Sequence, residues 1–298
     1  MAIPAELAAP PAEREELGTA KGGFQTWRRF RRHRLALIGA VILGLIVLSA
    51  IFAPLLSPYN PYVPDPFNMT AAPGPQHLLG TDQNGSDVLS RLFYGGRYSL
   101  GIGVSAALLS TILGVVIGAT AGWAGGWIDN ALMRFVDLML SFPALFLLLI
   151  LFSITGGASV VVIVVFLGLF GWMYMARIVR AQILALRQQD FVQSAQSVGV
   201  PAVRIVVRHL LPNVLAAIIV TTTLEIAYNM LSEAILDFLG YGVAVDTPTW
   251  GNMLNSAEQH LLDAPQLAIA PGLALTLTIL CINFLGDGLR DALDPRLR

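Results

Sequence analysis

The sequence predicts an all-α membrane protein with six transmembrane helices, and its composition, apolar run lengths and arginine placement support this fold class. Of its 298 residues, 55% are hydrophobic and only 12% are charged, and the mean hydropathy is +0.69. Soluble domains carry about 25% charged residues, so much of this surface must face lipid. Several apolar runs also reach the roughly 20 residues that a helix needs to cross about 30 Å of hydrocarbon.

Residues 1–34 precede the first apolar run and are expected to form a cytoplasmic tail with a basic end. Residues 1–20 are rich in Ala, Pro and Glu without an apolar period, which is typical of disorder. The basic cluster comprises Lys21, Arg28, Arg29, Arg31, Arg32 and Arg34. A cleaved signal peptide also places basic residues before an apolar run, but residues 35–56 exceed its usual apolar core and lack a clear cleavage site. We interpret residues 35–56 as an uncleaved N-terminal transmembrane helix.

An extracytoplasmic loop is expected at residues 57–97, followed by a transmembrane domain over residues 98–289. Prolines interrupt helicity in the first part of the loop, and a short helical stretch is expected near residues 87–94. The transmembrane domain holds five apolar runs, at residues 99–122, 131–154, 159–176, 213–236 and 267–289. Residues 160–169 are rich in β-branched residues, but an open strand in lipid leaves its backbone unsatisfied, so we expect a helix there.

The basic residues predict the orientation of these spans. If the N-terminus is inside, the outer segments hold only Arg91 and Arg97, and almost all other arginines lie inside. Cytoplasmic loops carry an excess of Lys and Arg. We therefore expect a multi-pass protein of the cell (inner) membrane with a cytoplasmic loop at residues 177–213 and both termini, including the tail 290–298, in the cytoplasm.

Glycines at a four-residue spacing indicate close helix packing in the second span. Gly114, Gly118 and Gly122 lie on one helix face and leave it without side chains. Such a face allows a neighbouring helix to approach closely, and lipid itself provides no hydrophobic drive for helix association.

The cytoplasmic loop at residues 177–213 predicts two helices joined by an elbow. Gly199 can adopt a positive φ and end the first helix, and Pro201 suits the first turn of the next. The first helix carries the small residues Ser194, Ala195 and Ser197, so it is slim enough to enter a groove on another protein. An amphipathic linker lying on the membrane surface is the alternative that spacing alone leaves open.

This loop resembles the Glu-Ala-Ala loop of permeases in ABC importers. Gly199 is followed thirteen residues later by Pro212, as in that family, and Gln193-Ser194-Ala195 stands where the family has Glu-Ala-Ala. Gln193 keeps the length and hydrogen-bonding ability of the family glutamate but not its charge. The resemblance implies that Gln193, Ser194, Ala195, Gly199 and Pro212 dock on an ATPase subunit and couple its motion to the membrane helices.

Further motifs are similar to those of the C-type permeases of dipeptide, oligopeptide and nickel importers. Ser86 stands where those permeases normally have arginine. The similar motifs are His77-Leu-Leu-Gly-Thr-Asp82, Gly85, Asp87, Leu89-Ser-Arg-Leu92, Gly125-Gly-Trp-Ile-Asp129, Arg134, Asp137, Ser141-Phe-Pro143, Glu233-Ala, Phe238-Leu-Gly240, Trp250-Gly-Asn-Met-Leu254 and the tail from Gly286 to Arg298.

The resemblance implies a five-helix, MetI-like core with an additional N-terminal span. It also implies a heterodimer with a homologous second permease, two cytoplasmic ATP-binding subunits and an extracytoplasmic substrate-binding protein. This chain has no phosphate-binding Gly-x-x-x-x-Gly-Lys loop, since Lys21 is its only lysine. We expect no cofactor in this chain, because ATP and Mg²⁺ are bound by the partner ATPases.

A polar stripe in the fifth span is the candidate translocation pathway. Its members recur at every fourth position: Thr221, Glu225, Asn229, Glu233 and Asp237. A carboxylate at membrane depth costs at least about 2.5 kcal/mol unless it meets water or a partner. Glu225, Asn229 and Glu233 are predicted to line the pathway, where Glu225 or Glu233 could meet the terminal ammonium of a peptide. Pairing with neighbouring helices is the alternative, and Asp237 is expected near solvent at the outer end.

We expect a non-catalytic permease subunit for dipeptides or oligopeptides, and other function classes remain as alternatives. The importer could instead carry a nickel chelate or another small solute. An ion-coupled secondary transporter could use the carboxylates as a relay, but it is usually longer and has paired repeats. An intramembrane enzyme would need acids on facing spans. No metal site is expected from the scattered His33, His77, His209 and His260, and the net charge of −1 gives no indication of nucleic-acid binding.

Overall fold

The computed structural model describes residues 28, 30, 31, 33–155, 159–244 and 246–293, which form helices joined by loops. Lys21, Arg29, Arg32, Arg296 and Arg298, which belong to the two predicted cytoplasmic tails, lie outside the described residues. The helices are α3 (Arg34–Ile51), α4 (Ala53–Leu56), α5 (Val88–Ala124), α6 (Gly126–Leu140), α7 (Ala144–Thr155), α8 (Val160–Arg187), α9 (Asp190–Ser197), α10 (Ala202–Ile205), η1 (Val206–Leu210), α11 (Leu211–Phe238), α12 (Trp250–Ala257), η2 (Glu258–His260) and α13 (Gln266–Leu293). The described part of the chain contains no strand, so the predicted all-α class is confirmed.

Five helical stretches of the described chain are long and apolar enough to cross a membrane: α3, α5, α8, α10 through α11, and α13. The run predicted as one span at residues 131–154 differs from this pattern. It consists of α6 and α7, which are bent by 74° at residues 141–143. Pro143 explains the break, because its nitrogen cannot donate and its ring clashes with the preceding turn. If α6 and α7 together form one span, the total is the predicted six.

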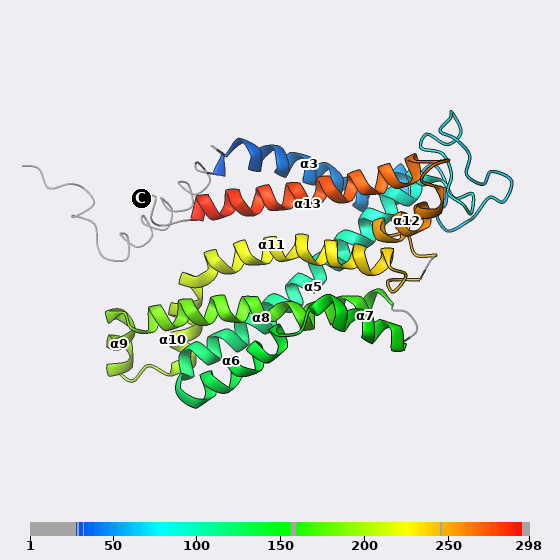
Figure 1. Ribbon diagram of the computed structural model, residues 1–298. Helices are drawn as coiled ribbons and strands as arrows, with labels where there is room; N and C mark the ends of the chain where they lie inside the picture. Colours follow the sequence, from blue (N-terminus) through cyan, green and yellow to red (C-terminus); the bar gives the residue numbers. More distant parts are fainter. Residues whose placement is uncertain (1–27, 29, 32, 156–158, 245, 294–298) are drawn as a thin grey trace, which may run out of the picture.

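The spans run between two ends of the molecule (Figure 1). One end holds α9, the start of α3 and the end of α13, while the other holds α12 and the long loop between α4 and α5. N-terminal helix α3 packs along α13, where a side chain on Gly39 would meet the carbonyl oxygen of Cys281 at 3.1 Å. The start of α3, the end of α13 and the loop helix α9 therefore lie on the same side of the bundle.

Helices α5 and α8 form the closest helix pair of the fold. An added Cβ on Gly114 would lie 2.5 Å from Met175 Cβ. One on Gly122 would lie 2.9 Å from the carbonyl oxygen of Arg180. The predicted glycine face of residues 114–122 is thus confirmed as the surface on which α8 packs.

Helix α8 continues to Arg187, past the predicted end of its span at residue 176. Ion pairs to α6 support this extension. Arg180 donates to both carboxyl oxygens of Asp129, at 2.6 Å for Nη2, and Arg177 lies 2.5 Å from Asp137. Consequently, the first third of the predicted loop at residues 177–213 belongs to α8.

The motif residues at the other end stabilise the long loop and the start of α5. His77 Nδ1 lies 2.9 Å from Asp87 Oδ1, and the other oxygen of Asp87 accepts the backbone N–H of Ser90 at 2.8 Å. Asp87 is therefore the N-cap of α5. Arg91 lies 3.2 Å from Asp82. The helical stretch predicted near residues 87–94 is the first part of α5, not a separate helix.

Candidate coupling loop and transmembrane cavity

Helix α9 projects from the bundle and is held by one apolar face. Val192 is fully buried in a cluster that includes Ile183 on α8 and Ile205 on α10. Ala195 and Val200 pack against the same cluster. The short helix therefore has a fixed position relative to the ends of α8 and α11.

Gly199 forms the elbow that the sequence predicts. Its φ is +82°, which side-chain-bearing residues rarely adopt. Gly199 N–H donates to the carbonyl of Gln196 at 2.9 Å, and Val200 N–H donates to that of Ala195 at 3.0 Å. These two bonds form a Schellman motif that ends α9. No heavy atom would contact a Cβ at Gly199, so its backbone conformation, not lack of space, explains the glycine.

The outward face of α9 and its elbow is exposed and partly apolar. Gln193 and Ser194 are exposed, and Gln193 Nε2 donates to the carbonyl of Gln188 at 3.2 Å. Val198 is 85% exposed and Val203 is 75% exposed. This surface presents exposed apolar and polar side chains together, as interfaces with other proteins do.

Pro212 lies where the second loop helix joins the fifth span. The helix runs from α10 through a π-helical turn at Val206–Leu210 into α11, with Pro212 in the first turn of α11. Because Pro212 has no N–H, the turn before it widens. The loop is therefore continuous with α11.

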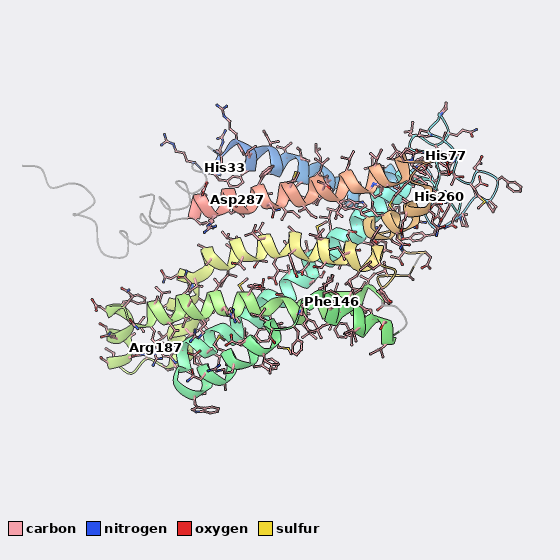
Figure 2. All side chains as sticks on the ribbon, in the orientation of Figure 1. His33, His77, Phe146, Arg187, His260 and Asp287 are labelled. Carbon is pink, nitrogen blue, oxygen red and sulfur yellow. The ribbon has the colours of Figure 1, made fainter. Side chains whose placement is uncertain are left out.

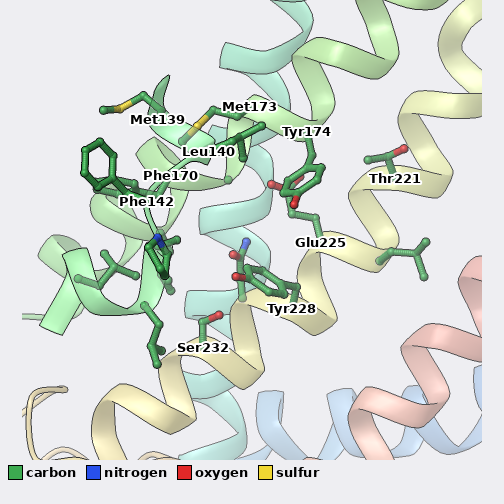
Figure 3. A pocket seen from close by; sticks show the side chains of 18 residues that line it. Met139, Leu140, Phe142, Phe170, Met173, Tyr174, Thr221, Glu225, Tyr228 and Ser232 are labelled. Atoms are coloured by element: carbon green, nitrogen blue, oxygen red, sulfur yellow. The ribbon is translucent and has the colours of Figure 1, made fainter. Parts of the chain in front are cut away.

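A cavity of about 410 Å³ lies among the α6–α7 break, α8 and α11 (Figure 3). Its lining is mainly apolar and includes Phe142, Pro143 and Met173. The polar side chains that line it are Tyr174, Thr221, Glu225, Tyr228, Asn229 and Ser232. Such convergence of a few polar groups in an apolar hollow is typical of small-molecule sites.

The side chain of Glu225 extends from α11 into this cavity, and one of its two carboxyl oxygens has a hydrogen-bond partner on α5. Ser110 Oγ donates to Glu225 Oε1, whereas the buried Oε2 has no hydrogen-bond partner in the described part of the chain. Gly171 on α8 makes room for this contact, because a Cβ there would lie 2.7 Å from Ser110 Oγ. Sequence reasoning found Glu225 but missed Ser110 and Gly171, which have no recognisable spacing relative to it.

Asn229 lies one turn further along α11 and lines the same cavity. It is only 1% exposed, and its Nδ2 has no hydrogen-bond partner among the described residues. A buried amide without a partner is costly. Glu225 and Asn229 thus present one acceptor and one donor group that have no hydrogen-bond partner in the described part of the chain.

The two remaining carboxylates of the stripe lie outside this cavity. Glu233 is fully buried, and Ser99 Oγ donates to its Oε2 at 3.3 Å. Its pathway role stays a prediction. Asp237, expected near solvent, is instead buried and accepts the N–H of Val243 at 2.8 Å and the hydroxyl of Thr249. Asp237 therefore holds the loop after α11 in place.

A second hollow of about 500 Å³ continues from the first toward the end that holds α9. Thr221 and Leu224 line both hollows, and Arg290 lies at the far end. No group of three or more His, Cys, Asp and Glu in the described ranges could hold a metal. In Figure 2, His33 lies near one end of the molecule while His77 and His260 lie near the other.

Comparisons with known proteins agree over most of the chain. The model of the binding-protein-dependent transport system inner membrane component matches residues 114–298. That of the N-terminal transmembrane domain of oligopeptide transport permease C matches residues 24–73. The glutathione transport system permease protein GsiD of Shigella flexneri serotype 5b (strain 8401) is 41% identical over 274 residues, covering 91% of this chain and 90% of the relative. The protein of that name from Escherichia coli O6:K15:H31 (strain 536 / UPEC) is 39% identical over the same shares.

Proposed function

This chain belongs to the family of binding-protein-dependent transport inner membrane components, as an ABC importer permease, and from this premise we propose that it forms half of a peptide translocation pathway driven by separate ATPase subunits. The family consists of non-catalytic, multi-pass membrane subunits. The proposal rests on one observation, the position of α9. This short exposed helix is connected through α10 and η1 to α11, which lines the cavity.

Helix α9 and its elbow are the proposed contact with the ATPase. Gln193, Ser194 and Ala195 dock on it, while Gly199 sets the angle between the two loop helices. Support comes from the exposed apolar surface at Val198 beside the buried anchor Val192. Closure of the ATPase dimer on ATP would then move α9 and, through the turn at Pro212, α11.

The pathway follows α11 past Glu225 and Asn229. The two adjoining hollows support this course, because they extend from the α6–α7 break toward the end that holds α9. We also place Glu233 in the proposed pathway, at a stage of the transport cycle in which the helices around it have moved apart. With α9 in the cytoplasm, both chain termini lie there too, and the loop between α4 and α5 faces the outside.

The proposed partners are a homologous second permease, two ATP-binding subunits that hold ATP and Mg²⁺, and an extracytoplasmic substrate-binding protein. Peptides as cargo are supported by the oligopeptide permease match at residues 24–73 and by relatives named for glutathione transport. A nickel chelate is the alternative cargo within the same class, and the ion-coupled carrier is the alternative class.

Reconstitution tests the proposal. The chain is purified with the proposed partner permease and ATPases. Peptide uptake against a gradient is measured in liposomes with ATP on the side of the ATPases, with ATP on the opposite side only, and without ATP. Uptake should require ATP, and a Ser194→Cys variant lacking Cys281 should cross-link to the ATPase while a Phe67→Cys variant should not. Uphill uptake by this chain alone would exclude the proposal, and so would absence of the Ser194 cross-link.

A further inference from the structure

The cavity at Glu225 has the properties of a specific binding site. We propose that Glu225 and Asn229 bind the terminal ammonium and the adjacent carbonyl group of a peptide inside the membrane. This inference rests on the proposed function, because it assumes that peptides enter this cavity. It distinguishes Glu225 from Glu233, which the sequence alone treats alike.

The surroundings of the Glu225 carboxyl group favour a ligand that carries a hydrogen-bond donor. One of its oxygens accepts the Ser110 hydroxyl, and the other is buried without a partner among the residues that the structure describes. A buried carboxyl oxygen that has lost its water is stabilised by a charged donor more than by a neutral one. A primary ammonium group carries a positive charge and three N–H donors. Glu233 offers no such place, because it does not line the cavity.

Asn229 supplies the complementary group at the right separation. It lies four residues from Glu225, a rise of about 6 Å along a helix, so both side chains open into one cavity. Its buried Nδ2 has no partner in the described ranges of the chain and carries two N–H groups that can donate. A peptide has a carbonyl acceptor next to its terminal ammonium, so a single residue of the ligand can satisfy both side chains.

Two tyrosines complete the site. Tyr174 from α8 and Tyr228 from α11 line the same cavity as Glu225 (Figure 3). The face of an aromatic ring attracts a cation within about 6 Å. The remaining lining, including Met173 and Phe142, is apolar and suits a ligand side chain without selecting it. The site therefore recognises the amino end of a peptide and does not select among the side chains of the rest of the peptide.

Cysteine protection measures binding in this chain directly. Thr221→Cys, which lines the cavity, is placed in a Cys281→Ala background, where it is the only cysteine of this chain. The full complex in membrane vesicles is labelled with N-ethylmaleimide in the presence of trialanine or S-methylglutathione, or of the N-acetylated form of each. Phe67→Cys on the exposed loop controls for reagent reactivity.

At least one peptide with a free amino group should slow the labelling of Thr221→Cys, and its N-acetylated form should not. Glu225→Gln should raise the peptide concentration for half protection by about tenfold or more, the factor that one charge-assisted hydrogen bond supplies. Asn229→Ala should raise it less. The exposed Glu258→Gln makes the same charge change outside the cavity and should leave it unaltered.

Three results would overturn the inference: no protection by either free-amino peptide, equal protection by the N-acetylated forms, or protection that survives Glu225→Gln. ATP-driven peptide uptake is measured in the same vesicles. If uptake occurs without protection, the ammonium site is excluded and the proposed function stands. Protection without any ATP-driven uptake excludes the proposed function instead.

Discussion

A side chain on Gly118 would lie 2.5 Å from the carbonyl oxygen of Ala176, so α5 and α8 are in backbone contact at this point. Gly118→Ala should therefore force the helices apart and lower the stability of the chain by about 1–3 kcal/mol, as overpacking does in other cores. The thermal unfolding temperature of the purified protein in detergent measures this loss.

Gly101 provides the matched control on the same helix. No heavy atom would lie within 4 Å of a Cβ there, so Gly101→Ala should leave the unfolding temperature unchanged or raise it slightly. Equal effects of the two substitutions would show that helix propensity, not the contact with Ala176, governs the change.

The Asp129–Arg180 ion pair should stabilise the junction of α6 and α8. Asp129 is buried, and Arg180 donates to both of its oxygens. Asp129→Asn should cost about 1–3 kcal/mol, less than a fully buried pair because Arg180 keeps some contact with water. A double-mutant cycle with Arg180→Gln measures the coupling, and strictly additive effects would contradict it.

The elbow residue should be essential for coupling. Gly199→Ala forces a left-handed conformation that costs about 1–2 kcal/mol for a residue with a Cβ. We expect the angle between α9 and α10 to change, so that peptide uptake falls while ATP is still hydrolysed. The ratio of uptake to hydrolysis in proteoliposomes measures this, and Ser197→Ala, which keeps Gly199, is the control. An unchanged ratio for Gly199→Ala would argue against the role of the elbow.

Transport should depend on the carboxylate of Glu225. Glu225→Ala removes the charged acceptor from the cavity, and we expect uptake to fall about tenfold, the equivalent of one lost charge-assisted hydrogen bond. Assembly should persist, because the hydrogen-bond partner that Glu225 has among the described residues is a single buried hydroxyl, that of Ser110. Co-purification of the subunits and vesicle uptake are measured together. Normal uptake by an intact Glu225→Ala complex would remove Glu225 from the pathway.

The two ends of the bundle should lie on opposite sides of the membrane. Ser197 on α9 and Phe67 on the loop before α5 are both exposed. In a Cys281→Ala background, a membrane-impermeant maleimide should label Phe67→Cys in intact cells and Ser197→Cys only in inverted vesicles. Labelling of both from one side would refute the orientation predicted from the arginines.

Much of the fold could be predicted from the sequence because lipid imposes simple rules on it. Apolar run length predicts the spans, and helices follow because backbone groups have no other partners in hydrocarbon. The glycine face at residues 114–122 and the elbow at Gly199 could also be predicted, because each depends on a local property of glycine. The first depends on the absence of a side chain, and the second on a positive φ. The bend at Pro143 was not predicted, because the residues before and after Pro143 are equally apolar and together have the length of one span.

The candidate site shows where sequence reasoning ends. By itself, the sequence determined the family, the helices and the polar stripe on α11, because periodicity places every fourth residue on one helix face. It could not tell Glu225, which opens into a cavity, from Glu233, which is enclosed beside Ser99. Only the tertiary structure decided this, because the difference arises from what α5, α8 and α12 bring against α11, and helix periodicity carries no information about those neighbours.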